Sequence, residues 1–138
     1  SLIKTAAAHG LAQKVTFTGA LNAAEVIHCY SGADLFVFSS TTETQGLVLI
    51  EAMAGGVPVV AVKATGSIES VIHGYNGFLT DNSAADLAAK AQLILTNHIL
   101  QKQMQSNALK TAQQYSIENT SRQLVEVYHQ TLTQAKVG

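Results

Sequence analysis

Short apolar runs alternate with longer helical patterns over the first 80 residues of the chain. Residues 15–18 and 78–80 have the β-rich composition that predicts strands. Residues 35–38 and 57–62 are almost wholly apolar, so we expect strands that are buried on both faces. The strand at residues 35–38 is therefore expected to lie in the centre of its sheet. The helical patterns between these runs predict helices over residues 23–31, 47–54 and 68–73.

The remaining residues, from 84 to 136, carry a helical pattern without strands. Residues 81–83 (Asp-Asn-Ser) supply candidate N-caps for this segment. Interruptions at Asn97 and at residues 116–119 divide it into about three helices. The last of these helices carries an apolar stripe that we expect to lie in the core or on a docking face, consisting of Leu124, Val127, Tyr128 and Leu132.

Alternating strands and helices followed by helices alone predict an α/β fold. We expect a three-layer parallel sheet with helices on both faces and a helical C-terminal tail. The 138 residues have about the length of one domain, so residues 1–138 are interpreted as a single unit.

Composition excludes several classes of function. Eight Lys and Arg against nine Asp and Glu give a net charge of −1, which argues against a nucleic-acid binder or a basic membrane-docking surface. No leader and no membrane-spanning run are recognised, so a cytoplasmic location is predicted. The single Cys29 excludes an intrachain disulfide, and we expect it to be buried. The five histidines show no metal-ligand spacing, so no metal site is expected.

The candidate ligand site is the polar loop at residues 39–46. This loop follows a predicted strand and precedes an apolar helix, and in an open parallel sheet ligands bind at the carboxyl ends of the strands. A helix that begins near Gly46 points free N–H groups and the positive end of its dipole at the site, which favours a phosphate. Gly46 has no side chain that would keep an anion at a distance.

Glu43 and Glu51 stand on either side of this helix start. Eight helical steps span about 12 Å, whereas two carboxylates that act on one glycosidic bond lie about 5 to 9.5 Å apart. The pair therefore suits opposite ends of an elongated ligand such as a nucleoside diphosphate sugar, because carboxylates bind vicinal hydroxyls well. Two simpler interpretations stay open: Glu43 could only complement the helix dipole, and Glu51 could be a solvated helix residue.

Residues 42–60 (TETQGLVLIEAMAGGVPVV) resemble the E-x7-E segment of the large retaining glycosyltransferase family 4. Four further elements of that family match in order. Residues 15–19 are similar to its V-x-F-x-G element, and residues 30–34 to its Y-x-x-A-D element. Residues 66–69 match G-x-x-E, and residues 74–77 match G-x-N-G.

The resemblance implies the C-terminal, donor-binding half of a GT-B fold, which consists of two Rossmann-like domains. It implies that Glu43, as the catalytic-site residue, contacts hydroxyls of the transferred sugar, and that Glu51 contacts the ribose. The pyrophosphate would be held by the backbone N–H groups of Gly46, Leu47 and Val48. The base pocket would be lined by Thr16, Thr18 and Gly19.

The family's chemistry supplies the remaining expectations. Its members use a donor such as a UDP-sugar, retain the anomeric configuration, and need neither metal nor cofactor, because the helix dipole and basic residues take the metal's place. The acceptor-binding N-terminal domain and the family's basic residues are absent from this chain, so we expect the fragment alone to be inactive. Gln45, where the family often has Phe, resembles glycolipid-forming glucosyltransferases. A lipid or polysaccharide acceptor and peripheral membrane association of the full-length enzyme are implied.

Two alternatives belong to other functional classes. A nucleotide-sugar epimerase of the same fold would need no acceptor, and the release of free UDP with an elongated product by the full-length enzyme would exclude it. A non-catalytic module could use the same pocket for sensing. Loss of turnover with retained UDP binding in full-length Glu43→Ala would argue against that module.

Overall fold

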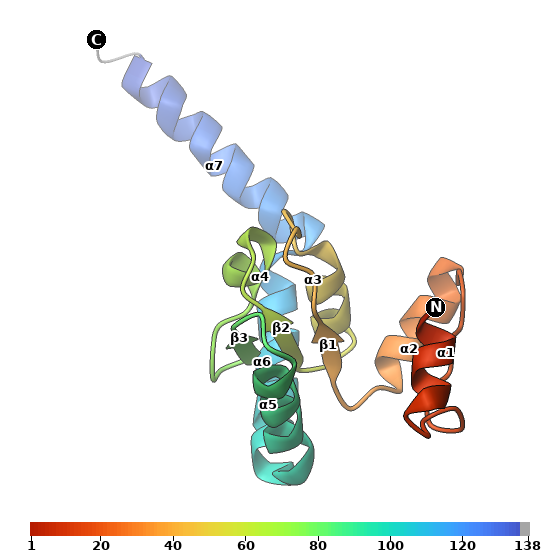
Figure 1. The fold of residues 1–138 in the computed structure, drawn as a ribbon. Helices are drawn as coiled ribbons and strands as arrows, with labels where there is room; N and C mark the ends of the chain where they lie inside the picture. The colour runs from red at the N-terminus through yellow and green to blue at the C-terminus, as the bar shows by residue number, and fades with distance from the viewer. Residues whose placement is uncertain (136–138) are drawn as a thin grey trace.

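The computed structural model describes the backbone of residues 1–135 and the side chains of residues 1–127. Its sheet consists of three parallel strands in the order β1-β2-β3 (Figure 1). The strands are β1 (Phe36–Phe38), β2 (Val59–Val62) and β3 (Gly77–Thr80). Phe36 pairs with Val59, and Val59 pairs with Gly77 on its other side. The parallel α/β sheet predicted from the sequence is confirmed.

Helices connect the strands and form the tail. Ser83, one of the predicted N-caps, accepts the Asp86 N–H, and Asn97, where an interruption was predicted, caps the next helix by accepting the Leu100 N–H. The helices are α1 (Leu2–Ala8), α2 (Ala23–Ser31), α3 (Leu47–Ala54), α4 (Thr65–Ser70), α5 (Ala84–Thr96), α6 (His98–Gln114) and α7 (Ile117–Ala135). The three helices predicted after residue 84 are confirmed.

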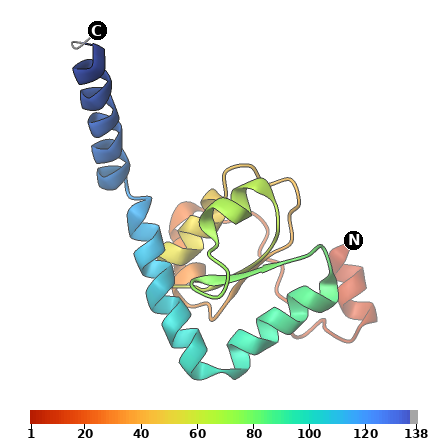
Figure 2. The same cartoon turned by 90° about the vertical axis from the view of Figure 1, so that its left-hand side faces the viewer.

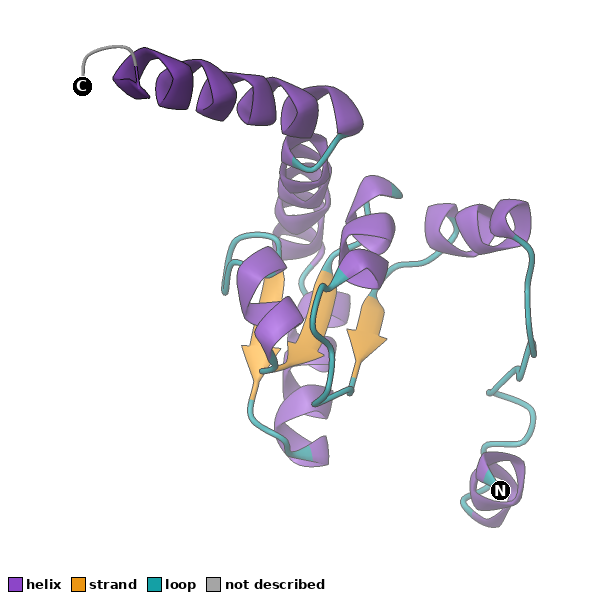
Figure 3. Ribbon diagram, turned by 90° about the horizontal axis from the view of Figure 1, so that it is seen from above, coloured by secondary structure: helices purple, strands orange, loops and turns teal. Residues whose placement is uncertain are grey.

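Both faces of the sheet are covered by helices (Figure 3). All four residues of β2 are buried, and alternate side chains enter two separate apolar clusters. Val59 and Ala61 pack in the cluster that contains Leu49 and Met53 of α3. Val60 packs in the opposite cluster with Ile94 of α5, together with Phe78 and Met104. The three-layer arrangement therefore follows from the two-sided burial of one apolar strand.

The last helix projects away from the α/β body (Figure 2). On it, Leu124 and Val127 are 55% and 56% exposed. The expectation that these two residues lie in the core is therefore wrong, and the alternative of a docking face stays a prediction. The side chains of Tyr128 and Leu132, the other two members of the predicted stripe, lie outside the described residues.

The N-terminal third departs furthest from the predictions. Residues 15–18 form no strand and are exposed, because no strand among residues 1–135 pairs with them. Consequently β1 is an edge strand rather than a central one, and Val37 is 44% exposed. Cys29 is exposed rather than buried, in a helix none of whose residues is buried. Helix α4 spans Thr65–Ser70, earlier than the predicted residues 68–73.

Candidate functional site

The loop at residues 39–46 lies at the carboxyl end of β1, where the sequence predicts a ligand site. Its last residue, Gly46, is the N-cap of α3 and has a φ of 66°, a left-handed conformation that glycine adopts at little cost. Within this turn the Glu43 carboxylate bends back onto its own backbone. Its Oε1 atom accepts the N–H groups of Gln45 at 3.0 Å and Gly46 at 2.8 Å.

These two hydrogen bonds favour the ionised form of Glu43. The Gly46 N–H, followed by the Gln45 N–H, lowers the pKa of the Glu43 carboxyl below its ordinary value. Donors that bind the ionised form favour that form, so Glu43 stays a carboxylate at neutral pH. An ionised carboxylate can only accept hydrogen bonds, which suits contact with sugar hydroxyls rather than proton donation.

The first turn of α3 provides two further donors. The N–H groups of Leu47 and Val48 have no acceptor among residues 1–135, whereas the Gly46 carbonyl already accepts from Leu49 and Ile50. Of the three backbone N–H groups predicted to bind pyrophosphate, that of Gly46 is thus engaged by Glu43 and the other two are open. An anion at this helix start would meet two donors and the positive end of the α3 dipole.

Helix α4, which follows β2, packs directly against the loop of residues 39–46. The Gly66 N–H donates to the Glu43 carbonyl at 3.0 Å, and the Ser70 hydroxyl donates to the Gly66 carbonyl at 2.9 Å. Both Gly66 and Ser70 are buried. Sequence reasoning did not assign these two residues to the site, and the only signal was the match of residues 66–69 to G-x-x-E.

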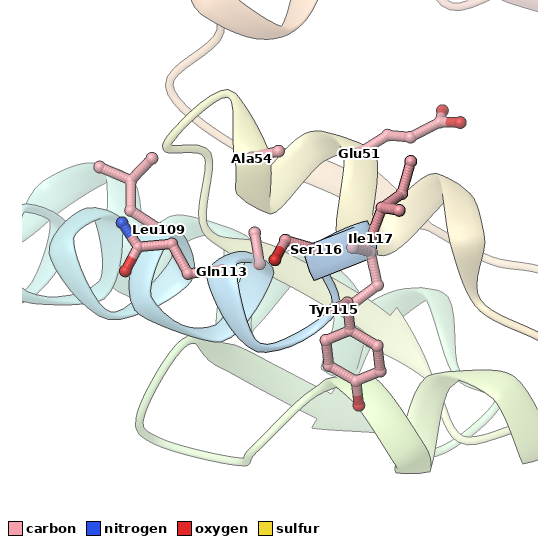
Figure 4. Close-up of a pocket in the computed structure, with 9 residues that line it drawn as sticks. Glu51, Ala54, Leu109, Gln113, Tyr115, Ser116 and Ile117 are labelled. Atoms are coloured by element: carbon pink, nitrogen blue, oxygen red, sulfur yellow. The ribbon is translucent and has the colours of Figure 1, made fainter. Parts of the chain in front are cut away.

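Glu51 lies further along α3 and is exposed, so its apolar neighbours in sequence do not bury it. Its helix separates two cavities. One, of about 470 Å³, lies between α3, α6 and the start of α7; Glu51 lines it together with Leu109, Gln113 and Ile117 (Figure 4). The other, of about 430 Å³, lies between α2 and α3 and is lined by Glu51, Leu21 and Tyr30. Glu51 can therefore reach a ligand on either side of α3.

Tyr30 joins α2 to this region. The Tyr30 ring contacts the Phe36 ring edge-on, with 5.6 Å between the centroids. Tyr30 also packs closely against Gly55, because a Cβ added at Gly55 would lie only 2.9 Å from the Cβ of Tyr30. Burial, and then the charge of Glu51, raises the pKa of the Tyr30 hydroxyl. Both effects favour the neutral phenol of Tyr30, which lines the second cavity together with Glu51.

The predicted base-pocket residues are not brought to this site. Thr16, Thr18 and Gly19 lie in the exposed segment between α1 and α2, and the Thr18 hydroxyl donates to the Gly19 carbonyl at 3.2 Å. Their role in binding a base stays a prediction. The structure thus assembles Glu43, Gly46, Leu47 and Val48 in one place, with Glu51 further along the same helix.

In the part of the chain that the structure describes, no cluster of three or more His, Cys, Asp or Glu side chains has a geometry suited to a metal ion. Among the same residues, no helix combines the length and the apolar character needed to cross a membrane.

Comparison with known proteins identifies the family. The family model described as glycosyl transferases group 1 matches residues 1–111. This chain belongs to the group 1 glycosyl transferases. It is 34% identical over 130 residues to a D-inositol 3-phosphate glycosyltransferase of Corynebacterium urealyticum, which covers 94% of this chain and 31% of that relative. It is 40% identical over 84 residues to the sulfoquinovosyl transferase SQD2 of Arabidopsis thaliana, covering 57% of this chain and 16% of that protein.

Solved structures of glycosyltransferases with the GT-B fold share the architecture of this group 1 domain. Anabaena HepE, solved in complex with UDP, aligns with a TM-score of 0.84 at 32% identity over 94% of this chain and 36% of its own. The C-terminal domain of a group 1 family protein (LpcC) of Francisella tularensis aligns with a TM-score of 0.77 at 27% identity, over 84% of this chain and 61% of its own. The chain spans about a third of the length of the D-inositol 3-phosphate glycosyltransferases that it matches.

Proposed function

We propose that this chain is the donor-binding part of a retaining hexosyltransferase of family 4 and holds a nucleoside diphosphate sugar at the start of α3. The observation that carries the proposal is the pair of open N–H groups of Leu47 and Val48 beside the Glu43 carboxylate. In the proposed complex these N–H groups bind the pyrophosphate and Glu43 binds hydroxyls of the sugar. Glu51 binds the ribose from further along α3.

The donor is proposed to be a UDP-sugar. Anabaena HepE, a relative with 32% identity, has been solved with UDP, with UDP and glucose, and with UDP-glucose. We expect binding without a metal ion, since the helix start supplies hydrogen bonds and partial positive charge to the phosphates. The base is assigned to the region of Thr16, Thr18 and Gly19 on the resemblance to the family alone.

The acceptor half of the reaction belongs to the whole protein. We propose that an additional N-terminal domain binds a lipid or polysaccharide acceptor and that this chain alone does not turn over. Gln45 supports a lipid acceptor through its resemblance to glycolipid-forming enzymes. A cytoplasmic location, with peripheral contact to the membrane, is part of the same proposal.

Calorimetric titration with UDP and 2′-deoxy-UDP in the presence of EDTA tests the assignment of Glu51. The native chain is expected to bind UDP and to bind the deoxy compound more weakly, because Glu51 loses a hydroxyl partner. In Glu51→Ala the affinity for UDP should fall by about 10- to 100-fold, the effect of losing charge-assisted hydrogen bonds. The variant should also no longer distinguish the two nucleotides.

Glu126→Ala is the matched control, since Glu126 is an exposed helical glutamate of α7. Its affinity for UDP should equal that of the native chain. Equal binding of UDP and deoxy-UDP by the native chain would remove Glu51 from the ribose site. UDP binding that disappears with EDTA would contradict the metal-independent donor site.

A further inference from the structure

Helix α4 touches the loop of residues 43–46 backbone to backbone at Gly66. The Gly66 N–H donates to the Glu43 carbonyl at 3.0 Å. A Cβ atom at Gly66 would lie 2.5 Å from the Gly46 nitrogen and 2.9 Å from the Gln45 nitrogen, closer than real Cβ contacts come. These two nitrogens are the ones whose N–H groups hold the Glu43 carboxylate.

Space, rather than backbone conformation, requires glycine at residue 66. Gly66 lies in the first turn of α4, and its φ is outside the left-handed range of Gly10, Gly19, Gly46, Gly56 and Gly74. Alanine at a helical position is favoured over glycine by about 1 kcal/mol. A methyl group at residue 66 is therefore unfavourable only because it would collide with the loop of residues 43–46.

Ser70 holds the other side of this contact. Its side chain is 2% exposed, and its hydroxyl donates to the Gly66 carbonyl at 2.9 Å. A Cβ at Gly46 would collide with that same carbonyl and lie 3.0 Å from the Ser70 Oγ. Helix α4 and the loop of residues 43–46 thus interlock through two glycines that each leave room for the other's backbone.

We propose that Gly66, held by Ser70, is a positioning residue that fixes the loop of residues 43–46 so that Glu43 and the start of α3 keep the geometry that binds the donor. Gly66 acts through Glu43 and makes no contact with the reacting atoms. The part of this inference that concerns the donor rests on the proposed function. The part that concerns the geometry of Glu43 can be tested without any ligand.

The test compares Gly66→Ala with Gly32→Ala in the 138-residue chain. Gly32 is the right-handed C-cap of α2, where a Cβ would make an ordinary 3.5 Å contact. Titration of the carboxyl groups followed by NMR is expected to show a Glu43 pKa below the ordinary glutamate value in the native chain and in Gly32→Ala. In Gly66→Ala the pKa of Glu43 should rise toward that ordinary value.

UDP titration of the same proteins is the second readout. Affinity should fall at least about tenfold in Gly66→Ala, about 1.4 kcal/mol, and be unchanged in Gly32→Ala. An unchanged Glu43 titration in Gly66→Ala overturns the positioning role, whatever happens to UDP. If Gly66→Ala has a raised Glu43 pKa but binds UDP as tightly as the native chain, Gly66 is not important for donor binding. A native chain that does not bind UDP contradicts the proposed function, and the Glu43 titration then still decides the positioning role.

Ser70→Ala is a second variant that adds no atom to the contact. It removes the hydroxyl that holds the Gly66 carbonyl, so a smaller rise in the pKa of Glu43 is expected in the same direction. This variant decides the question if Gly66→Ala does not fold. A Glu43 titration identical to that of the native chain in Ser70→Ala would then overturn the proposal.

Discussion

Gly46→Ala is expected to weaken UDP binding on the order of 100-fold while the α/β body stays folded. Two costs add at this residue. Alanine is strained at a φ of 66°, by about 1 to 2 kcal/mol, and its Cβ would collide with the Gly66 carbonyl beside the Ser70 hydroxyl. Relief of this overpacking, itself about 1 to 3 kcal/mol, requires the loop to move away from α4. That movement withdraws the N–H groups of Gln45 and Gly46 from the Glu43 carboxylate. It also changes the direction of the Leu47 and Val48 N–H groups, which are proposed to bind the pyrophosphate.

Gly10→Ala is the control that separates the two costs. Gly10 has a φ of 70°, nearly the same as Gly46, but a Cβ there would meet nothing within 4 Å. It should lose a little stability and keep the UDP affinity of the native chain in calorimetric titration. Equal affinities in Gly46→Ala and Gly10→Ala would show that the interlock between α4 and the loop of residues 43–46 does not matter for the donor site.

Asn76→Ala is expected to lower the free energy of unfolding by about 3 kcal/mol. The Asn76 side chain is fully buried and joins three segments of the chain. Its Nδ2 donates to the Ser70 carbonyl at 3.0 Å and to the Thr111 hydroxyl of α6 at 3.0 Å, and its Oδ1 accepts the Ile72 N–H at 2.9 Å. Alanine leaves these partners unsatisfied and creates a cavity at the end of α4.

Thermal unfolding followed by circular dichroism measures this loss. For a chain of 138 residues, about 3 kcal/mol corresponds to a decrease in Tm of about 10 °C. Asn82→Ala is the matched control, because Asn82 is exposed in the loop before α5 and the cap of that helix is Ser83. A Tm of Asn76→Ala within 2 to 3 °C of that control would contradict the role assigned to the buried amide.

The sheet and the start of α3 could be predicted because their signals are local. The apolar run at residues 57–62 favours a strand buried on both faces, and β2 is that strand. Gly46 directly before an apolar helical run marks the helix start as observed. In both places the residues that decide the structure are neighbours in sequence.

The interlock of α4 with the loop of residues 43–46 could not be predicted, because it joins residues that are distant in sequence. Glu43 meets Gly66 only when β1 and β2 lie side by side. The sequence around either residue contains no pattern that predicts this contact. The strand predicted at residues 15–18 is wrong although its signal is local. These residues have a sequence typical of a strand, but a strand also requires a partner strand, and none lies beside them among the described residues.

The most direct test of the donor site is to map UDP on the isotope-labelled chain by NMR, with uridine as the comparison. UDP carries the pyrophosphate that the start of α3 is proposed to bind, whereas uridine lacks it. We predict that UDP shifts the amide resonances of Leu47 and Val48 strongly and that uridine leaves both unchanged. Saturating UDP that leaves these two amides unmoved, or that shifts only residues elsewhere in the chain, would contradict the account.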